Sequence, residues 1–368
     1  MVSRRDFLKI TLSAAAFTAL SSPFRKAFAA VQPVKVLPTW KELVEVARWC
    51  PTVHNMQAHK LRIISETEAE LHYDPKRLLP VGDPPAIFFT VAMGIFVENL
   101  SIVAGASGAK VEITEVFEPL NVNAKETTLF AKLKMSFSDV QEELHPDLIL
   151  ERRTSRLQYD GKPLSQPVLD KMKETASKYN HEFFYTSEKA LVDFVIDLNQ
   201  VTLFEDLGSQ ANREELDRLF RYNKHEAETK KDGLWSKCMG FSGALMKSVF
   251  HHHEKWEKGF RKKFLAKHYI EGFKGSTTVC WFAGKFDNKY DWINAGQMFA
   301  RSWLHVTKGK GYIHPFGSLI TNVGANKQLK EKLPKPQDGN TLWMIFRAGG
   351  SDLPARSYRL STEEIIIT

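Results

Sequence analysis

The stretch AIFFTVAMGIFVENLSIVAGA, residues 86–106, indicates what kind of core this protein has. Its first twelve residues, Ala86–Val97, are nearly all apolar. A membrane-spanning helix needs about 20 apolar residues, so this run is too short to cross a bilayer. A helix that is apolar nearly all round is buried inside a protein. We therefore predict a buried central helix that ends at Gly105 and Gly108.

The C-terminal half contains a second mostly apolar helix, Asp291–Thr307, which is also followed by a glycine, Gly309. Gly94 stands 14 residues before Gly108, and Gly296 stands 13 residues before Gly309. This parallel suggests two copies of one unit, although a helix followed by glycine is a common pattern.

Strand and helix patterns alternate along the rest of the chain. Helical patterns occupy residues 40–49 and 189–221. Alternating or short apolar runs predict strands at residues 61–64, 69–73, 111–116, 131–137, 182–186, 277–283 and 341–347. Together these patterns predict an α+β fold.

The composition fits one large domain or two of ordinary size. The chain has 368 residues, of which 43% are hydrophobic and 11% aromatic, and its formal net charge is +8. Residues 1–30 hold five cations and one carboxylate, so the remaining chain keeps a net charge of +4. This charge is ordinary, and we expect no nucleic-acid partner. The basic run Arg261–Lys263 is interpreted as a solvated helix face.

The first 30 residues resemble an export signal of the twin-arginine type. Ser3–Lys9 matches the twin-arginine motif, Ile10–Ser22 is a mildly apolar run, and Ala27–Ala29 is a small-residue cleavage pattern. The alternative is an anchor helix that stays uncut. The resemblance implies the twin-arginine export machinery as a partner, a periplasmic or otherwise exported protein, and no stable membrane insertion after cleavage.

The three cysteines, Cys50, Cys238 and Cys280, form no CxxC pair. Two of them could form a disulfide in an oxidising compartment, and the sequence does not say which two. Cys280 lies in an apolar strand pattern, which indicates a core position.

The segment CPTVHNMQ, residues 50–57, is a candidate binding turn. Pro51 cannot extend the preceding helix. Thr52, Asn55 and Gln57 follow it closely, so the turn offers a hydroxyl, two amides and backbone N–H groups in one place. Such a segment is suited to binding a polar group.

A second candidate site is ILERRTSRLQYDGKPLS, residues 149–165. Arg152, Arg153 and Arg156 surround Thr154. Guanidiniums donate forked, charge-assisted hydrogen bonds, so this cluster suits a phosphate. The alternative is a basic surface cluster, which the composition taken alone favours.

Several segments, taken together, resemble the FMN-dependent nitroreductases. ARWCPTVHNMQAHKLRI resembles their flavin-binding segment, with the pattern A-P-S-x-x-N-x-Q-P-W, and ERRTSRLQYDGKPL resembles their R-R-S-x-R phosphate segment. DWINAGQMFARSWLHVTKGKGYIHPFGSL resembles the central helix and its following loop, and TLWMIFRAGGSDLPARSYRLSTEEII the C-terminal strand and basic tail. LHYDPKRLLPVGDPPAIFFTVAMGIFVENL is similar to a branch in which two such units are fused. The resemblance covers most of residues 40–368.

The resemblance implies two fused nitroreductase-like units, residues 31–148 and 149–368, which form an intramolecular pseudo-dimer. Each unit is expected to have an antiparallel-rich sheet flanked by helices around a buried central helix. The first unit carries the CPTVHNMQ turn and the second carries the arginine cluster, so one complete flavin site would take a contribution from each. Residues 247–267 match nothing in the common core and are interpreted as a surface insertion or a lid over the flavin.

The resemblance also implies FMN as the cofactor and no protein side chain as catalyst, since flavin N5 carries the chemistry. The first unit would contact the ring and ribityl chain, and the second unit and the tail would hold the phosphate. A loop near residue 316 would direct a backbone N–H to N5. The implied cofactor-binding residues are Pro51, Thr52, Val53, Asn55, Gln57, Arg152, Arg153, Thr154, Arg156, Pro315, Phe316, Gly317, Arg356 and Arg359.

The sequence departs from the family pattern at several positions. Cys50 replaces an alanine, and Ala58 and His59 stand where proline and tryptophan are expected. His59 could contact a substrate or be a structural histidine. His251–His253 are adjacent, so they do not face one way along a helix, and no carboxylate or cysteine spacing supports a metal site.

The expected activity is two-electron transfer through FMN from a small-molecule donor to a small electrophile such as a nitroaromatic or quinone. Export makes NAD(P)H scarce, so a quinol, a thiol or a membrane redox partner could replace it as donor. One alternative is a flavin-binding or flavin-sequestering protein with a lidded site and little turnover. Another is a scaffold that has lost its cofactor, with Arg152, Arg153 and Arg156 pointing to solvent.

Overall fold

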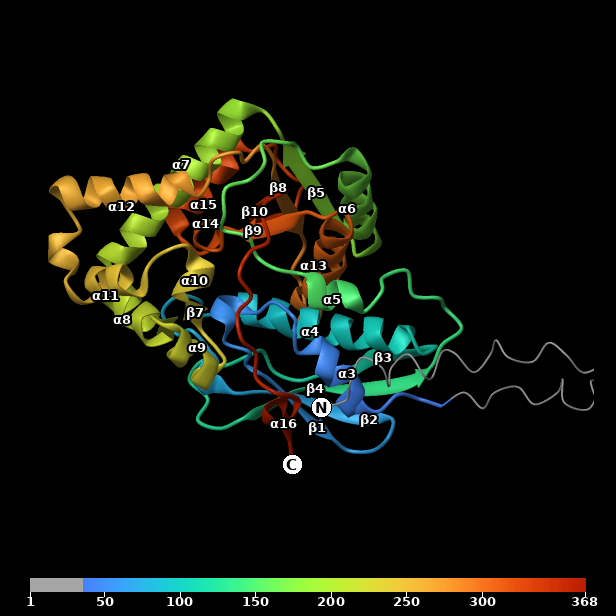
Figure 1. The fold of residues 1–368 in the computed structure, drawn as a ribbon. Helices are drawn as coiled ribbons and strands as arrows, with labels where there is room; N and C mark the ends of the chain where they lie inside the picture. The colour runs from blue at the N-terminus through green and yellow to red at the C-terminus, as the bar shows by residue number, and fades with distance from the viewer. Residues whose placement is uncertain (1–35) are drawn as a thin grey trace, which may run out of the picture. The chain divides into compact units, whose positions relative to one another are not determined.

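Two long helices, α4 (Ile87–Gly105) and α13 (Asp291–Lys308), pack against each other at the centre of the fold (Figure 1). They meet at Gly94 and Gly296. A Cβ atom on Gly94 would lie 2.1 Å from the carbonyl oxygen of Ile293, and one on Gly296 would lie 2.1 Å from that of Val91. Only glycine allows the two backbones to approach this closely. Both predicted central helices are confirmed.

Helix α4 is a core helix. It is long and apolar enough to cross a membrane, but 78% of its most apolar window is buried inside the protein. Its N-terminus is capped by Asp83, whose carboxylate accepts hydrogen bonds from the N–H groups of Ile87 and Phe88 at 3.0 and 2.9 Å. Further along, the buried carboxylate of Glu98 pairs with Arg301 on α13 at 2.5 Å. The two central helices are therefore joined by both close packing and a buried ion pair.

The first sheet has five strands in the order β11-β1-β2-β4-β3. All neighbours are antiparallel except β11, which runs parallel to β1. The strands are β1 (His59–Ile63), β2 (Glu68–Tyr73), β3 (Ala109–Val116), β4 (Thr128–Phe137) and β11 (Ile366–Ile367). The C-terminal tail therefore returns to complete the sheet built by the N-terminal half.

The second sheet has four antiparallel strands in the order β5-β8-β10-β9. They are β5 (His181–Thr186), β8 (Val279–Gly284), β9 (Tyr312–Pro315) and β10 (Thr341–Gly349). Its chain path matches that of the first sheet without β11: two strands, a central helix, then two strands, with the last strand lying between the second and third. Strand β9 was not predicted from the sequence.

The two sheets differ in the connection between their first two strands. Residues 64–67 join β1 to β2, whereas residues 187–278, here called the insertion, join β5 to β8. Residues 247–267, which the sequence singles out, are a part of this longer insertion. Its elements are α7 (Lys189–Gly208), α8 (Gln210–Leu219), β6 (Phe220–Arg221), α9 (Lys224–Lys230), β7 (Leu234–Trp235), α10 (Ser236–Met239), α11 (Gly243–His251), η3 (His253–Lys255) and α12 (Gly259–Glu271).

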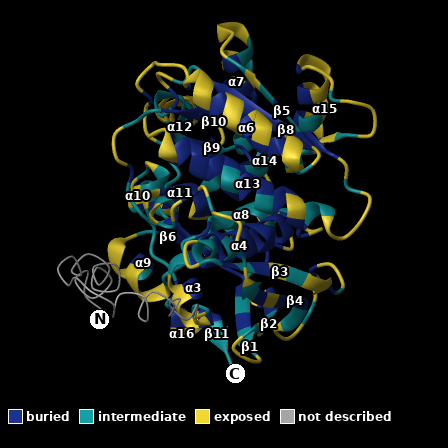
Figure 2. Ribbon diagram, turned by 90° about the vertical axis from the view of Figure 1, so that its right-hand side faces the viewer, coloured by how far each residue is buried: buried dark blue, intermediate teal, exposed yellow. Residues whose placement is uncertain are grey.

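The remaining helices flank the sheets and lie between the two halves of the chain (Figure 1). They are α3 (Trp40–Ala47), η1 (Val53–Asn55), η2 (Pro75–Arg77), α5 (Asp147–Glu151), α6 (Gln166–Lys178), α14 (Ser318–Thr321), α15 (Val323–Lys332) and α16 (Thr362–Ile365). The largest hydrophobic cluster includes buried side chains of α4, α13 and both sheets, and the insertion has a smaller cluster of its own (Figure 2).

The computed structural model describes residues 36–368, and residues 37–368 form one compact unit. The predicted export signal, residues 1–30, lies outside the described residues. All three cysteines are free, and Cys280 is fully buried as predicted.

Candidate functional site

The turn predicted to bind a polar group has an unusual backbone. His54, Asn55 and Gln57 have φ values of 46°, 60° and 52°, in the left-handed region that is costly for residues other than glycine. The Thr52 hydroxyl accepts a hydrogen bond from the N–H of Gln57 at 3.0 Å. The turn is therefore held in a strained shape, which favours a functional role for this segment.

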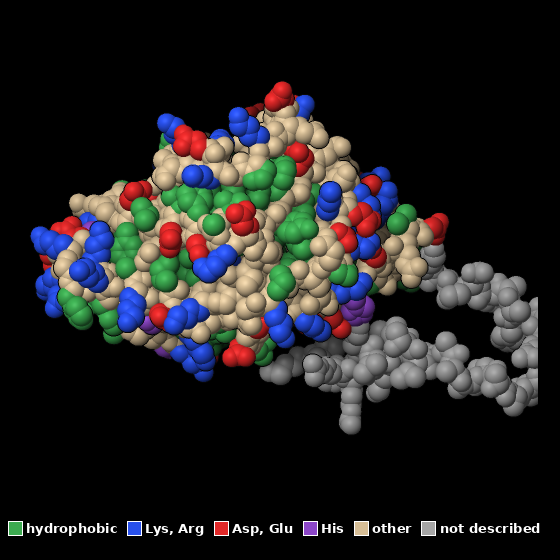
Figure 3. All heavy atoms as spheres, turned by 90° about the horizontal axis from the view of Figure 1, so that it is seen from above, with side chains coloured by type: hydrophobic (Ala, Val, Ile, Leu, Met, Phe, Trp, Pro, Cys, Tyr) green, Lys and Arg blue, Asp and Glu red, His purple; other side chains and the backbone are tan. Residues whose placement is uncertain are grey.

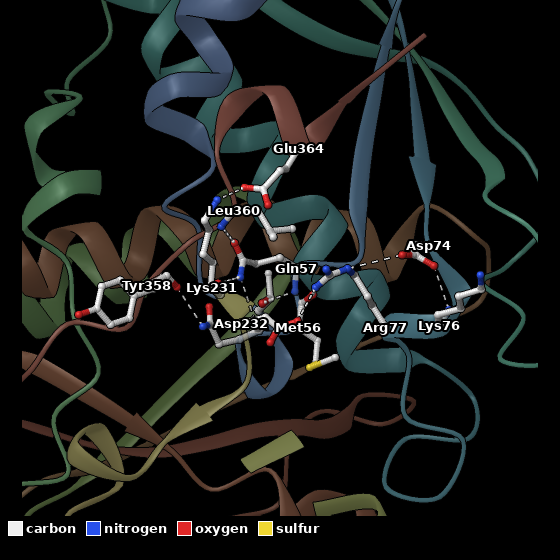
Figure 4. Close-up of polar contacts among 12 residues, drawn as sticks. Met56, Gln57, Asp74, Lys76, Arg77, Lys231, Asp232, Tyr358, Leu360 and Glu364 are labelled. Carbon is white, nitrogen blue, oxygen red and sulfur yellow. Dashed lines mark hydrogen bonds and ion pairs between the residues drawn. The ribbon is translucent and has the colours of Figure 1, made fainter. Parts of the chain in front are cut away.

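Gln57 holds this shape from inside (Figure 4). Its side chain is fully buried, and its amide nitrogen donates to the carbonyl oxygens of Asn55 and Lys231 at 3.0 and 2.9 Å. Its amide oxygen accepts from the N–H of Leu360 at 2.9 Å. Gln57 thus joins the turn, the insertion and the C-terminal tail.

An ion-pair network also fixes the insertion to the turn. Asp232 of the insertion pairs with Arg77 at 2.9 Å and with Arg221 at 2.6 Å. Arg77 donates to the carbonyl oxygen of Met56 in the turn at 2.9 Å (Figure 4). Buried pairs of this kind are costly to break because one charge is then left without a partner.

A small cavity of ≈ 100 Å³ lies between the turn, the arginine segment and the C-terminal tail, and the insertion closes its remaining side. It is here called the cationic cavity. Five guanidiniums contribute to its lining, those of Arg152, Arg153, Arg156, Arg356 and Arg359, and no carboxylate does. Its other lining residues are Trp49, Pro51, Thr52, His54, Asn55, Thr154, Gly233, Leu234, Trp235, Cys238, Met239, Ala355 and Ser357.

None of these five arginines forms a salt bridge within residues 36–368, so their charges are held by neutral groups. Arg152 donates to the carbonyl oxygen of Trp49 at 2.9 Å, and Arg153 donates to that of Pro354 at 2.5 Å. The Arg356 guanidinium lies 3.5 Å from the centre of the Trp49 ring. Four of the five carry a buried guanidinium nitrogen without a partner: Arg152 Nε, Arg153 Nε, Arg356 Nη2 and Arg359 Nε.

Burial and mutual repulsion lower the pKa of these arginines. Burial, followed by the nearby Arg359, lowers the pKa of Arg152 to about 9. Burial, followed by Arg153 and Arg359, lowers the pKa of Arg356 to about 10. Burial likewise lowers the pKa of Arg156. The cluster therefore lacks an anion that would balance its charge.

A second, larger cavity of ≈ 460 Å³ adjoins the first and is here called the apolar cavity. The two cavities share the lining residues His54, Arg156, Leu234 and Met239. The turn and the loop after β9 contribute Val53, Pro315, Phe316 and Gly317, whereas the insertion contributes Leu203, Phe204, Leu207, Leu216, Phe220, Phe241, Met246, Phe250, Leu265 and Tyr269. A charged compartment thus opens beside an apolar one.

Two histidines line the apolar cavity, and both are uncharged at neutral pH. Burial, and then the charge of Arg156, lowers the pKa of His54 to about 4. The same causes, together with Arg347, lower the pKa of His314 well below its usual range. His314 is buried on β9, and its ring stacks with that of Phe273.

The structure brings most of the predicted site residues together. The cationic cavity contains Pro51, Thr52, Asn55, Arg152, Arg153, Thr154, Arg156, Arg356 and Arg359, and the apolar cavity contains Val53, Pro315, Phe316 and Gly317. Gln57 lines neither cavity, because its amide is fully used inside the protein. Arg152 is 6% exposed, which contradicts the expectation that a disused cluster would point to solvent.

His59 also lies away from both cavities. It is 1% exposed and stacks on Phe96 with ring centres 4.2 Å apart. Its position is that of a structural histidine. In the described part of the chain, no three His, Cys, Asp or Glu residues are grouped to hold a metal ion, and His251 contacts the carboxylate of Asp217 instead.

Sequence reasoning missed Trp49, His54 and the whole wall supplied by the insertion. Trp49 follows a predicted helix and could have been read as core. The pairing of residues from 203–269 with the turn has no local signal, because it arises from contacts across more than 130 positions of the chain, such as that between Gln57 and Lys231.

No family model matches this sequence, and no curated protein does. The solved structures that resemble it are nitroreductase-like proteins. A putative nitroreductase from Anabaena variabilis is 10% identical, with a TM-score of 0.41, and the match covers 84% of this chain and 73% of that one. A nitroreductase with bound FMN from Bacteroides fragilis is 12% identical, with a TM-score of 0.34. A BluB-like flavoprotein from Clostridium difficile is also 12% identical, with a TM-score of 0.37.

The matches to the last two structures cover 60% of this chain and 97% of theirs. The present chain is thus longer than these single-unit relatives in structure. At these identities and TM-scores, the likeness does not by itself place the chain in a family.

Proposed function

We propose that this protein binds FMN and is an oxidoreductase of the nitroreductase type. The observation that carries the proposal is the cationic cavity: five guanidiniums without a carboxylate partner, beside an apolar cavity. FMN has the matching shape, with a planar ring system at one end and a phosphate at the other.

The residues of the cationic cavity fit a phosphate. Four buried guanidinium nitrogens there lack a hydrogen-bond partner. A buried donor without a partner costs roughly 1–3 kcal/mol, so a bound phosphate would remove a penalty as well as add charge-assisted bonds. Arg152, Arg153, Arg156, Arg356 and Arg359 would hold it.

The apolar cavity fits the ring system. Val53, Pro315, Phe316 and Gly317 line it. A side chain added to Gly317 would meet only the Phe88 ring, at 3.8 Å, so the space beside this glycine is open. Backbone without a side chain permits close approach to a planar ring. When bound, FMN supplies hydride transfer, while the protein supplies binding, orientation and exclusion of water.

The same proposal includes the pseudo-dimer. It is supported by the matching strand order of the two sheets and by the reciprocal contact of Gly94 and Gly296. In this interpretation the turn comes from one unit and the arginine cluster from the other, so the cofactor lies where they meet. The donor and the acceptor are small molecules, and the acceptor is an electrophile such as a nitroaromatic or a quinone.

We also propose export through the twin-arginine route, supported by Ser3–Lys9. Substituting both Arg4 and Arg5 by lysine should then leave the protein in the cytoplasm. Fractionation of cells that express the two forms tests this, and equal export of both forms would reject it.

A second candidate function is flavin sequestration without turnover. It is favoured by the insertion, since α11 and α12 supply Met246, Phe250 and Leu265 to the wall of the apolar cavity. Such a wall could exclude substrates. Steady-state turnover with any donor and acceptor pair distinguishes this function from that of an enzyme.

The direct test is an absorbance spectrum of the purified protein, followed by identification of the released flavin. The proposal predicts a flavin spectrum and released FMN. A colourless protein that does not take up added FMN would reject both candidate functions.

A further inference from the structure

Helix α12 presents apolar side chains on two opposite sides. Leu265 and Tyr269 face inward and line the apolar cavity. At 100° per residue, Phe260 and Phe264 lie on the opposite side of the helix. These two rings are 81% and 46% exposed, and nothing in the described chain covers them.

Cations surround the two exposed rings. Residues 258–267 contain five cations and no carboxylate. Lys263 and Lys267 lie on the same outer side as Phe260 and Phe264 by helical spacing, and all four are exposed. Figure 3 shows lysine and arginine side chains gathered at the left-hand end of the view, where α12 lies in Figure 1. The outer surface of α12, defined by these four residues, is thus both apolar and basic.

We propose that the outer surface of α12 docks on an anionic lipid membrane. Phe260 and Phe264 would enter the headgroup region, and Lys263 and Lys267 would meet lipid phosphates. Aromatic and basic side chains on one helix face are the features that hold peripheral helices at such surfaces.

Two other occupants fit less well. A second copy of this chain would bring the same five cations face to face, and like charges repel across a symmetric contact. A nucleic acid would neutralise the cations, but it would leave two phenylalanine side chains at the centre of the contact against a strongly charged backbone.

Docking would also bring the candidate site close to the lipid. The outer and inner sides of α12 are separated by one helix diameter, about 10 Å. The apolar cavity would therefore lie directly behind the membrane-facing helix, where an apolar molecule from the lipid could reach it. The docking proposal itself does not depend on flavin binding.

The test is sedimentation of the full-length protein with phosphatidylcholine vesicles, with and without phosphatidylglycerol. Residues 1–30 include an apolar run that could bind lipid by itself, so the readout is the difference between variants. The test variants are F260S/F264S and K263E/K267E. The matched controls are V323S and K327E/K330E on α15, where an 84% exposed valine lies near lysines that do not belong to α12.

We expect each α12 variant to weaken binding to the anionic vesicles by about tenfold or more, while the α15 variants bind like the wild type. Circular dichroism should show that all variants are folded. Equal binding of the wild type and all four variants, or equal binding to both vesicle types, would overturn the proposal. Dimerisation or DNA binding that is lost only in the α12 variants would also overturn it, in favour of those partners.

Discussion

Gly94 and Gly296 lie against each other where α4 meets α13, and their environments are reciprocal. A Cβ on Gly94 would lie 3.1 Å from the Cα of Gly296, and a Cβ on Gly296 would lie 3.0 Å from the Cα of Gly94. Each would also come within 2.1 Å of a carbonyl oxygen on the facing helix, of Ile293 and Val91 respectively. This reciprocity is what a two-fold arrangement of equivalent helices produces.

Alanine at either glycine should destabilise the protein. The two helix backbones would have to separate, so we expect G94A and G296A each to lower the free energy of unfolding by about 2–3 kcal/mol. Gly208, at the end of α7, is a matched control because a Cβ there meets nothing within 4 Å. G208A should be neutral or stabilising by up to about 1 kcal/mol. Urea unfolding measures all three, and a G94A protein as stable as G208A would contradict this packing.

Replacing Arg156 should weaken ligand binding without weakening the fold. The Arg156 guanidinium lines both cavities and has no salt-bridge partner within residues 36–368. We expect R156M to reduce FMN affinity by about 10- to 100-fold and to change apo stability by less than about 1 kcal/mol. Flavin fluorescence and urea unfolding measure the two effects.

Arg347 provides the contrast. It is fully buried and donates to the carbonyl oxygens of Gly272 and Leu157, both at 2.9 Å, and to Ser276 Oγ at 2.8 Å. It lines neither cavity, so we expect R347M to cost roughly 3 kcal/mol or more of stability. If R156M were instead the more destabilising of the two, Arg156 would be a structural arginine.

His54 should make stability depend on acid pH. Its pKa is lowered by burial and by Arg156 from 6.5 to about 4. Between these values the unfolded chain binds a proton that the native protein does not, so the contribution to stability is lost as the pH falls from 6.5 to 4. The loss is at most about 3 kcal/mol.

The variant H54N isolates this effect, because asparagine tolerates the left-handed φ of 46° and does not titrate. The stability of the wild type relative to H54N should fall across this pH range. The exposed H145N variant is the control. Parallel pH profiles for wild type and H54N would show that His54 is not responsible.

Removing the Gln57 amide should separate the parts that it joins. Q57L leaves the carbonyl oxygen of Lys231 and the N–H of Leu360 without their buried partner, so we expect a loss of about 2–4 kcal/mol. Because Gln57 lines neither cavity, the FMN affinity of the folded Q57L protein should stay within a few-fold of the wild type. A large loss of affinity at unchanged stability would instead assign Gln57 to the cofactor site.

Sequence patterns predicted the core better than the site. Apolar runs revealed α4 and α13 because burial on all sides leaves a continuous signal in the sequence. The turn and the arginine cluster were found separately, and family resemblance joined them. Gln57 was misplaced because its pattern position says nothing of the left-handed φ of 52° that accompanies its buried side chain.

The insertion shows what local patterns cannot supply. Met246 and Phe250 fit an amphipathic helix, but no periodicity states that they face a cavity shared with Val53 and Phe316. That arrangement depends on contacts such as Asp232 with Arg77, which are distant in sequence. Trp49 was missed for the same reason, since its partner Arg356 comes from the other end of the chain.

The central claim is that the cationic cavity binds the phosphate of a flavin whose ring occupies the apolar cavity. The most direct test compares the dissociation constants of FMN and riboflavin, which differ only in the phosphate, for the wild type and for R156M. We predict that the wild type binds FMN at least about 100-fold more tightly than riboflavin, and that R156M reduces this ratio by about tenfold or more. Equal affinity of the wild type for the two flavins, or no binding of either, would contradict the account.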